Sequence, residues 1–248
     1  MARCPFAQQR ILPENKTQSP IIPRSVIFHT AVDGPGPTDL AAYFGQVKIK
    51  AESHFYVTLG GVIVQMMDTE IEADANGSAD KFAISVETED DSARRGSDIL
   101  PWSLAQIDAL TRLADWCCTT HKIPRRRATS AYLPGAAGIA YHSQPMRERF
   151  DGTAHNPWTA YQGKSCPGDA RVAQYPGVVA RVAATNTPPP AGDDDVPYLE
   201  WPQKDKDALI ADIRKALLYP LTGSQPAHPE RDEEWMNMSK LANQIASK

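Results

Sequence analysis

The sequence predicts an α/β protein in which helices flank a mixed central β-sheet. Three features of the chain support this fold class. Residues 24–31 (RSVIFHTA) form a short continuous apolar run, which is typical of a strand buried within a sheet. Residues 54–66 (HFYVTLGGVIVQM) contain two strand-like runs joined by Gly60 and Gly61, the pattern of a hairpin. Residues 103–121 carry apolar side chains at helical spacing, so we expect helices to pack on the sheet.

The remaining elements follow in chain order. Residues 38–44 (TDLAAYF) are predicted to form a short helix, and residues 82–89 (FAISVETE) alternate like a strand that ends in acidic residues. The long helix begins with a capping box, because Ser103 and Gln106 have the required spacing and residue types. Residues 176–184 (PGVVARVAA) are predicted to form the closing helix.

The chain is predicted to consist of a catalytic domain, a linker and a small helical extension. Residues 1–184 hold most of the strand and helix patterns. Residues 185–200 include three consecutive prolines and three consecutive aspartates, which is typical of a solvated linker. Residues 201–248 contain two amphipathic helical patterns. Their apolar stripes would otherwise be exposed, so we expect them to dock against another surface.

Composition and charge exclude several classes of function. The 248 residues are 42% hydrophobic and 23% charged, as in an ordinary globular protein. With a net charge of −4, the protein has no overall positive potential that would attract nucleic acid. No apolar run approaches the roughly 18 residues that a transmembrane helix needs. The first residues, MARCPFAQQRILPENK, lack the apolar region of a secretory signal, so we expect synthesis in the cytoplasm without a signal peptide.

The four cysteines are not expected to form a disulfide framework. Cys117 and Cys118 are adjacent, and disulfide geometry rarely allows adjacent cysteines to bridge. Cys117 lies on the apolar stripe of the long helix, which predicts a core residue. Cys4 carries no informative pattern. Cys166 differs, because its Lys-Ser-Cys-Pro-Gly turn has no apolar periodicity that would explain a buried structural cysteine.

Polar residues follow several predicted strands. Ligands of open α/β sheets bind beyond the carboxyl ends of the strands, which is where these side chains are expected to lie. Two imidazoles and one thiolate are sufficient for a catalytic zinc site that keeps water as its fourth ligand. Six histidines allow many such triples, so composition alone does not single one out. The candidate residues are His29, Glu87, His142, Lys164 and Cys166.

Five segments in order resemble the zinc-dependent N-acetylmuramoyl-L-alanine amidases of the phage-lysozyme and peptidoglycan-recognition-protein superfamily. The resemblance covers roughly residues 20–184. Among members of this superfamily, the chain most resembles endolysins of phages that infect actinobacteria. Each segment alone is a loose match, whereas the ordered set is fairly specific. The segments are VIFHTA (26–31), ESHFYVTLGGVIVQ (52–65), AISVETED (83–90), GIAYH (138–142) and GKSCPGDARV (163–172).

The resemblance implies hydrolysis of the amide between N-acetylmuramic acid and L-alanine in bacterial peptidoglycan. It implies that His29, His142 and Cys166 bind Zn²⁺, which would acidify a water molecule and polarise the scissile carbonyl. It also implies that Glu87 acts as the general acid/base and that Lys164 stabilises the oxyanion. A role as an ordinary surface carboxylate remains the alternative for Glu87, because Glu89 and Asp90 follow it closely.

The choice of the second histidine ligand rests on two conflicting signals, the spacing to Cys166 and the local sequence context. His155 lies eleven residues before Cys166, close to the short spacing of many relatives, whereas His142 lies 24 residues before it. Choosing His142 therefore requires an inserted loop over about residues 143–161. Local context favours His142, because it ends a strand that can hold its ring rigidly. His155 is predicted to line a groove or lie on the surface.

Two other function classes remain open at this stage. The first is a module of the same fold that binds peptidoglycan without cleaving it, and the second is an unrelated zinc hydrolase. The endolysin interpretation predicts a monomer that reaches the cell wall through a holin and lyses the host. Release of new amino-terminal alanine from cell wall would separate the amidase from both alternatives.

Overall fold

The computed structural model describes residues 2–32, 43–44, 52–91, 98–163 and 165–185. The chain divides into units of residues 1–187 and 188–248, and only the first unit contains described residues. The predicted linker beyond residue 185 and the predicted extension therefore lie outside the described residues. The same is true of residues 38–42 of the predicted short helix.

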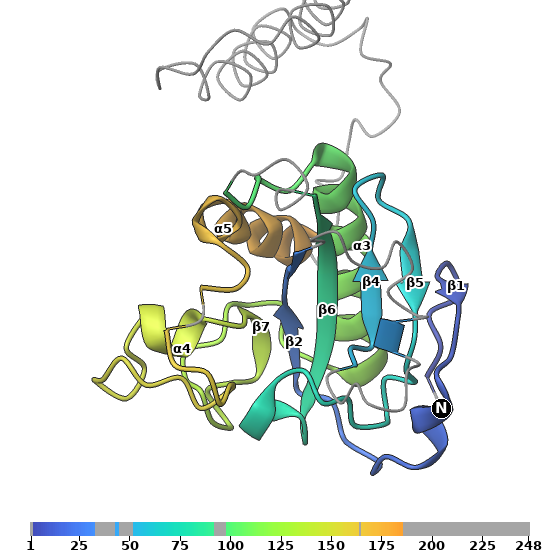
Figure 1. The fold of residues 1–248 in the computed structure, drawn as a ribbon, viewed down its shortest axis with the longest axis horizontal. Coiled ribbons are helices and arrows are strands. Elements are labelled where there is room, and N and C mark those ends of the chain that lie inside the picture. Colours follow the sequence, from blue (N-terminus) through green and yellow to red (C-terminus); the bar gives the residue numbers. More distant parts are fainter. Residues whose placement is uncertain (1, 33–42, 45–51, 92–97, 164, 186–248) are drawn as a thin grey trace, which may run out of the picture. The chain divides into compact units, whose positions relative to one another are not determined.

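A mixed seven-stranded sheet forms the centre of the first unit, as the sequence predicts (Figure 1). Its order is β1-β5-β4-β6-β2-β7, and β3 pairs with β6. The pairing of β4 with β5 is antiparallel, which confirms the hairpin at Gly60 and Gly61, and the other pairings among the described strands are parallel. The strands are β1 (Gln8–Gln9), β2 (Ser25–Phe28), β3 (Ala31–Val32), β4 (Phe55–Val57), β5 (Ile63–Gln65), β6 (Ala83–Asp90) and β7 (Gly138–Tyr141).

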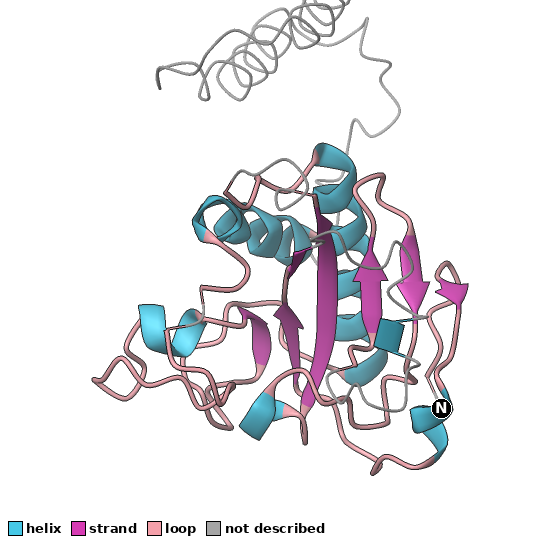
Figure 2. Ribbon diagram, viewed as in Figure 1, coloured by secondary structure: helices cyan, strands magenta, loops and turns pink. Residues whose placement is uncertain are grey.

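Two long helices, α3 (Leu104–His121) and α5 (Asp169–Ala184), share one core with the sheet (Figures 1 and 2). The capping box at the start of α3 is present, with Ser103 accepting from the Gln106 N–H and Gln106 reaching back to Ser103. The predicted core residue Cys117 is fully buried between this helix and the sheet. Shorter helices are η1 (Pro13–Lys16), η2 (Gly77–Ala79) and α4 (Gln144–Arg147).

Helix α5 begins earlier than the sequence predicts. It starts at Asp169 rather than at residue 176, and Pro176 lies inside it. An internal proline removes one backbone hydrogen bond and usually marks a boundary, so pattern analysis places the start there. Gly168 precedes the helix with a φ of 97°. The helix therefore follows directly on the Cys-Pro-Gly turn.

The two faces of the sheet differ in what covers them. Val26 and Phe28 of β2 belong to the core that contains α3 and α5. Successive side chains of a strand point to opposite faces, so Ile27 and His29, which are two residues apart, both face the other side. There Ile27 packs in a cluster with Ala140 and the buried indole of Trp158, and the other members of this cluster come from strands, turns and loops. The strand-end histidines therefore lie on the face without the long helices.

Among the described residues, no helix has the length and hydropathy that a membrane span requires.

Candidate metal centre

The register of three parallel strands brings the predicted site residues together. Phe28 of β2 pairs with Val86 of β6 and with Tyr141 of β7. The residue that follows each of these lies in the next row, which is just beyond the ends of β2 and β7 but within β6, because β6 continues to Asp90. The backbone pairing continues into this row, because the His29 N–H donates to the Val86 carbonyl at 2.8 Å. The residues of the row are His29, Glu87 and His142.

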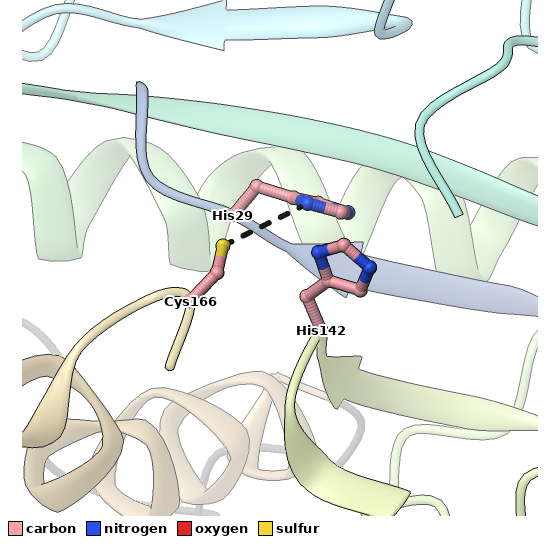
Figure 3. Close-up of side chains that lie close together, drawn as sticks. All are labelled: His29, His142 and Cys166. Carbon is pink, nitrogen blue, oxygen red and sulfur yellow. Dashed lines mark hydrogen bonds between the residues drawn. The ribbon is translucent and has the colours of Figure 1, made fainter. Parts of the chain in front are cut away.

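His29, His142 and Cys166 form a buried cluster (Figure 3). One potential ligand atom from each residue lies within 4.8 Å of the others. The Cys166 sulfur is 3.9 Å from His29 Nδ1, and the two imidazole centroids are 4.4 Å apart. Figure 3 shows the two rings and the sulfur converging from β2, from the end of β7 and from the loop before α5.

The far nitrogen of each imidazole meets a hydrogen-bond acceptor. His29 Nε2 lies 2.8 Å from Asn76 Oδ1, and His142 Nε2 lies 2.7 Å from the Trp158 carbonyl oxygen. Both acceptors favour the tautomer that carries its proton on Nε2. In that tautomer the lone pair is on Nδ1, which is the arrangement of a metal-binding histidine oriented by an outer partner.

The two turns that supply these acceptors pack against each other. Ser78 N–H donates to the Pro157 carbonyl at 3.2 Å. Gly77 has a φ of 53°, and a Cβ there would lie 2.9 Å from the Trp158 carbonyl carbon. Only a glycine allows this close approach. The acceptors for His29 and His142 therefore share one support.

Hydrogen bonds from Thr30 and Ser143 hold the loop before α5, which carries Cys166, in place. Thr30 N–H donates to the Cys166 sulfur at 3.3 Å, and Thr30 Oγ1 donates to the Pro167 carbonyl at 2.8 Å. Ser143 N–H donates to the Cys166 carbonyl at 2.9 Å. A Cβ at Gly168 would lie 2.9 Å from Ile99, so the turn requires glycine for space as well as for its φ. These contacts hold Cys166 in place and explain the glycine of the Cys-Pro-Gly turn.

Glu87 lies beside the cluster, and Lys164 lies outside the described residues. The Glu87 side chain is 14% exposed, and its Oε1 is 3.9 Å from His29 Nδ1. A carboxylate at this distance can exchange a proton with a molecule held at the cluster. The role predicted for Lys164 stays a prediction.

The structure places the two competing histidines differently. His142 belongs to the buried cluster, whereas His155 is exposed on the loop that follows. That loop supports His142, because Asn156 Nδ2 donates to the His142 carbonyl at 2.9 Å and Trp158 contributes its own carbonyl. Sequence reasoning missed Asn76, Asn156 and Trp158, whose contacts depend on tertiary structure.

The donor set fits zinc. Zinc–sulfur and zinc–nitrogen bonds of about 2.3 and 2.0–2.1 Å at tetrahedral angles separate donor atoms by about 3.3–3.6 Å. The sulfur-to-Nδ1 separation of 3.9 Å is only slightly larger. A thiolate with two imidazoles suits zinc better than magnesium or calcium, which prefer oxygen ligands. Three protein ligands are also the number found in catalytic zinc sites.

Comparison with known proteins identifies the family. No curated protein sequence matches the chain. Among solved structures, the chain is similar to the endolysin amidase LysCS from Clostridium intestinale URNW, with 13% identity, a TM-score of 0.44 and coverage of 65% of this chain and 84% of that one. It is also similar to Staphylococcus aureus hydrolase AmiA in complex with its ligand, with 12% identity, a TM-score of 0.48 and coverage of 73% and 83%. A mutant endolysin from Bacillus subtilis gives 17% identity, a TM-score of 0.46 and coverage of 73% and 99%.

The family model described as N-acetylmuramoyl-L-alanine amidase matches residues 17–169. This segment is more than half of the chain, and it contains the whole His29–His142–Cys166 cluster. The chain therefore belongs to the N-acetylmuramoyl-L-alanine amidase family.

Proposed function

We propose that this protein is a zinc-dependent amidase that cleaves the bond between N-acetylmuramic acid and L-alanine in peptidoglycan. The observation that carries the proposal is the buried cluster of two imidazoles and one cysteine sulfur at the strand ends. Family membership supports the class of bond.

His29, His142 and Cys166 would hold the metal. The acceptors on their outer side orient both imidazoles, so that Nδ1 of each ring is the ligand atom. When bound, zinc supplies a Lewis acid that lowers the pKa of water and polarises a carbonyl. The chain contributes a rigid set of ligands, because two of the three follow strands and the third is fixed by Thr30 and Ser143.

Glu87 would act as the general acid/base. It follows Val86 in the same row as the histidines and is only partly exposed. In this role its carboxylate accepts a proton from the attacking water and passes it to the nitrogen of the departing L-alanine. Lys164, two residues before Cys166, would donate a charged hydrogen bond to the oxyanion.

The experiment that tests the proposal measures both product and metal. Purified peptidoglycan is incubated with the protein, and new amino termini are labelled with dinitrophenyl and identified. We expect new amino-terminal alanine, its loss after treatment with a strong chelator, and its return with added zinc. New termini on other residues would indicate a peptidase. Full activity in protein shown to be metal-free would contradict the zinc mechanism.

A peptidoglycan-binding module without catalysis is the second candidate. It predicts retention on cell wall with no new amino termini. The complete ligand set argues against it, because a binder has no need for a buried thiol between two imidazoles.

The biological role we propose is that of a phage endolysin that acts on the cell wall after release through a holin. Its test is lysis of actinobacterial cells when the protein is produced inside them together with a holin. Survival of cells that contain active amidase and a functional holin would contradict this role.

A further inference from the structure

Arg171 is a buried cation just beyond the segment that the family model matches. It lies on α5, five residues after Cys166, and is 0% exposed. The matched segment ends at residue 169, so the family comparison does not include it. Its guanidinium donates to acceptors on three other segments of the chain. These acceptors are Leu100 O at 2.9 Å, Thr30 Oγ1 at 3.0 Å, Thr88 Oγ1 at 2.7 Å, Thr88 O at 3.3 Å, Glu89 O at 2.8 Å and Asp90 Oδ1 at 3.2 Å.

Two of these acceptors are threonine hydroxyls, and each donates a further hydrogen bond to the backbone beside a proposed metal ligand. Thr30 Oγ1 donates to the Pro167 carbonyl, while the Thr30 N–H donates to the Cys166 sulfur. Thr88 Oγ1 donates to the carbonyl of His29 at 2.5 Å. One guanidinium therefore orients two hydroxyls. The Thr30 hydroxyl lies beside the cysteine ligand, and the Thr88 hydroxyl bonds the backbone carbonyl of the ligand His29. Each hydroxyl accepts from the guanidinium and donates onward, so its rotation is fixed.

The same guanidinium also holds the strand that carries Glu87. Its contacts with the carbonyls of Thr88 and Glu89 lie one and two residues after Glu87 on β6. Arg171 follows Cys166 on its own segment and contacts Thr30, which follows His29. The segments that supply three site residues thus converge on one side chain. The planar fork of arginine suits this task, since its five donors have fixed directions.

Stability alone explains Arg171 poorly. Burial lowers the pKa of Arg171, and the nearby carboxylate of Asp90 opposes that shift. Both members of the Arg171–Asp90 pair are 0% exposed. Taking two charges out of water costs roughly as much as their attraction returns, so apolar residues of similar volume often serve stability as well. The geometry of the contacts offers a better reason for a buried arginine here.

We propose that Arg171 is a positioning residue for the metal centre. It sets the position of Cys166 through Thr30 and the position of His29 through Thr88. The inference rests on the proposed function, because it assumes that these residues bind a metal.

The test uses the full-length protein, stripped of metal and titrated with Co²⁺. Cobalt bound to a thiolate gives a sulfur-to-metal absorption band that reports the geometry at Cys166. Arg171→Lys keeps the charge but loses the fork, and Thr30→Val removes only the hydroxyl that links Arg171 to Pro167. We expect both variants to bind cobalt about 10–100-fold more weakly and to shift the band, since outer partners of metal ligands have effects of this size.

Two further variants serve as controls. Arg181→Lys changes an arginine on the same helix that pairs with Asp108 at the surface, and it should leave affinity and band unchanged. Thr30→Ser restores a hydroxyl and should bind cobalt more tightly than Thr30→Val. If Arg171→Lys fails to fold, Thr30→Val decides the question.

The outcomes separate the inference from the proposed function. Folded Arg171→Lys and Thr30→Val proteins with the affinity and spectrum of the unchanged protein would overturn the positioning role alone. An unchanged protein that binds neither cobalt nor zinc would overturn the metal centre, and the positioning role with it.

Discussion

His54 and His142 are both buried histidines that flank strands of the same sheet, yet only His142 lies in the proposed metal cluster. Each directs Nε2 at a backbone carbonyl, His54 at Ile71 over 2.8 Å and His142 at Trp158 over 2.7 Å. They differ at the other nitrogen. His54 Nδ1 accepts the Ser85 N–H at 3.0 Å, whereas the His142 ring packs against His29. Burial and a hydrogen-bonded Nε2 are therefore shared, and the surroundings of Nδ1 separate the structural His54 from the proposed ligand His142.

The largest expected effect comes from removing a ligand. His142→Ala should lose zinc and lower amide hydrolysis by about 10³-fold or more, because the activated water and the polarised carbonyl depend on the metal. Metal content and release of amino-terminal alanine measure the two effects. His155→Ala is the matched control and should keep both, since His155 is exposed on the loop. Zinc retained by His142→Ala and lost by His155→Ala would reverse the assignment.

Glu87→Gln separates catalysis from metal binding. The amide keeps the size of the side chain but accepts protons poorly, so turnover should fall by about 10²–10⁴-fold with zinc still bound. Glu89→Gln, on the same strand, is the control, because Glu89 bonds the Leu59 N–H and has no predicted catalytic role. Equal losses in both variants would show that Glu87 has no special function.

His54 should control stability in acid. Burial lowers the pKa of His54 to about 4, from about 6.5 in an unfolded chain. Between these values the unfolded chain binds a proton that the folded protein does not, so stability is lost as pH falls from 6.5 to 4. We expect His54 to account for about 2–3 kcal/mol of this loss. Urea unfolding of metal-free protein should show a shallower acid slope in His54→Gln, and an unchanged slope would contradict this assignment.

Asp80 should have a smaller effect of opposite sign. Burial raises the pKa of Asp80 to about 7, and Asp74 and Glu72 reinforce the shift. Between pH 4 and 7 the folded protein holds a proton that the unfolded chain has released, so stability falls as pH rises. Asp80→Asn should therefore add about 1 kcal/mol at pH 8. It should also keep the bond from the Asn76 N–H. A variant that is less stable at pH 8 would contradict this sign.

Periodic patterns are local, so they predicted β2, β4, β5 and β6, whereas the two-residue strands β1 and β3 were not predicted. The three clustered residues were predicted through the resemblance to known amidases, since six histidines alone allow many triples. The partners of these residues were not predictable in the same way. Asn76 lies 47 residues from His29, and Arg171 lies 141 residues from Thr30. Only the sheet register and the packing of α5 bring them together. Local pattern also has limits within α3, because Leu104 follows the helical spacing of apolar residues and yet is 75% exposed at the first turn.

The close packing of Gly77 on Trp158 has a consequence for protein engineering. The loop over residues 143–161 would be an obvious segment to exchange between members of this amidase family in order to change their properties. Its Trp158 carbonyl, however, both bonds His142 and packs against Gly77 of the turn at residues 76–78. A graft of the loop alone would bring a foreign backbone against Gly77 and disturb the support of both histidines. Chimeric enzymes should therefore transplant the two segments together.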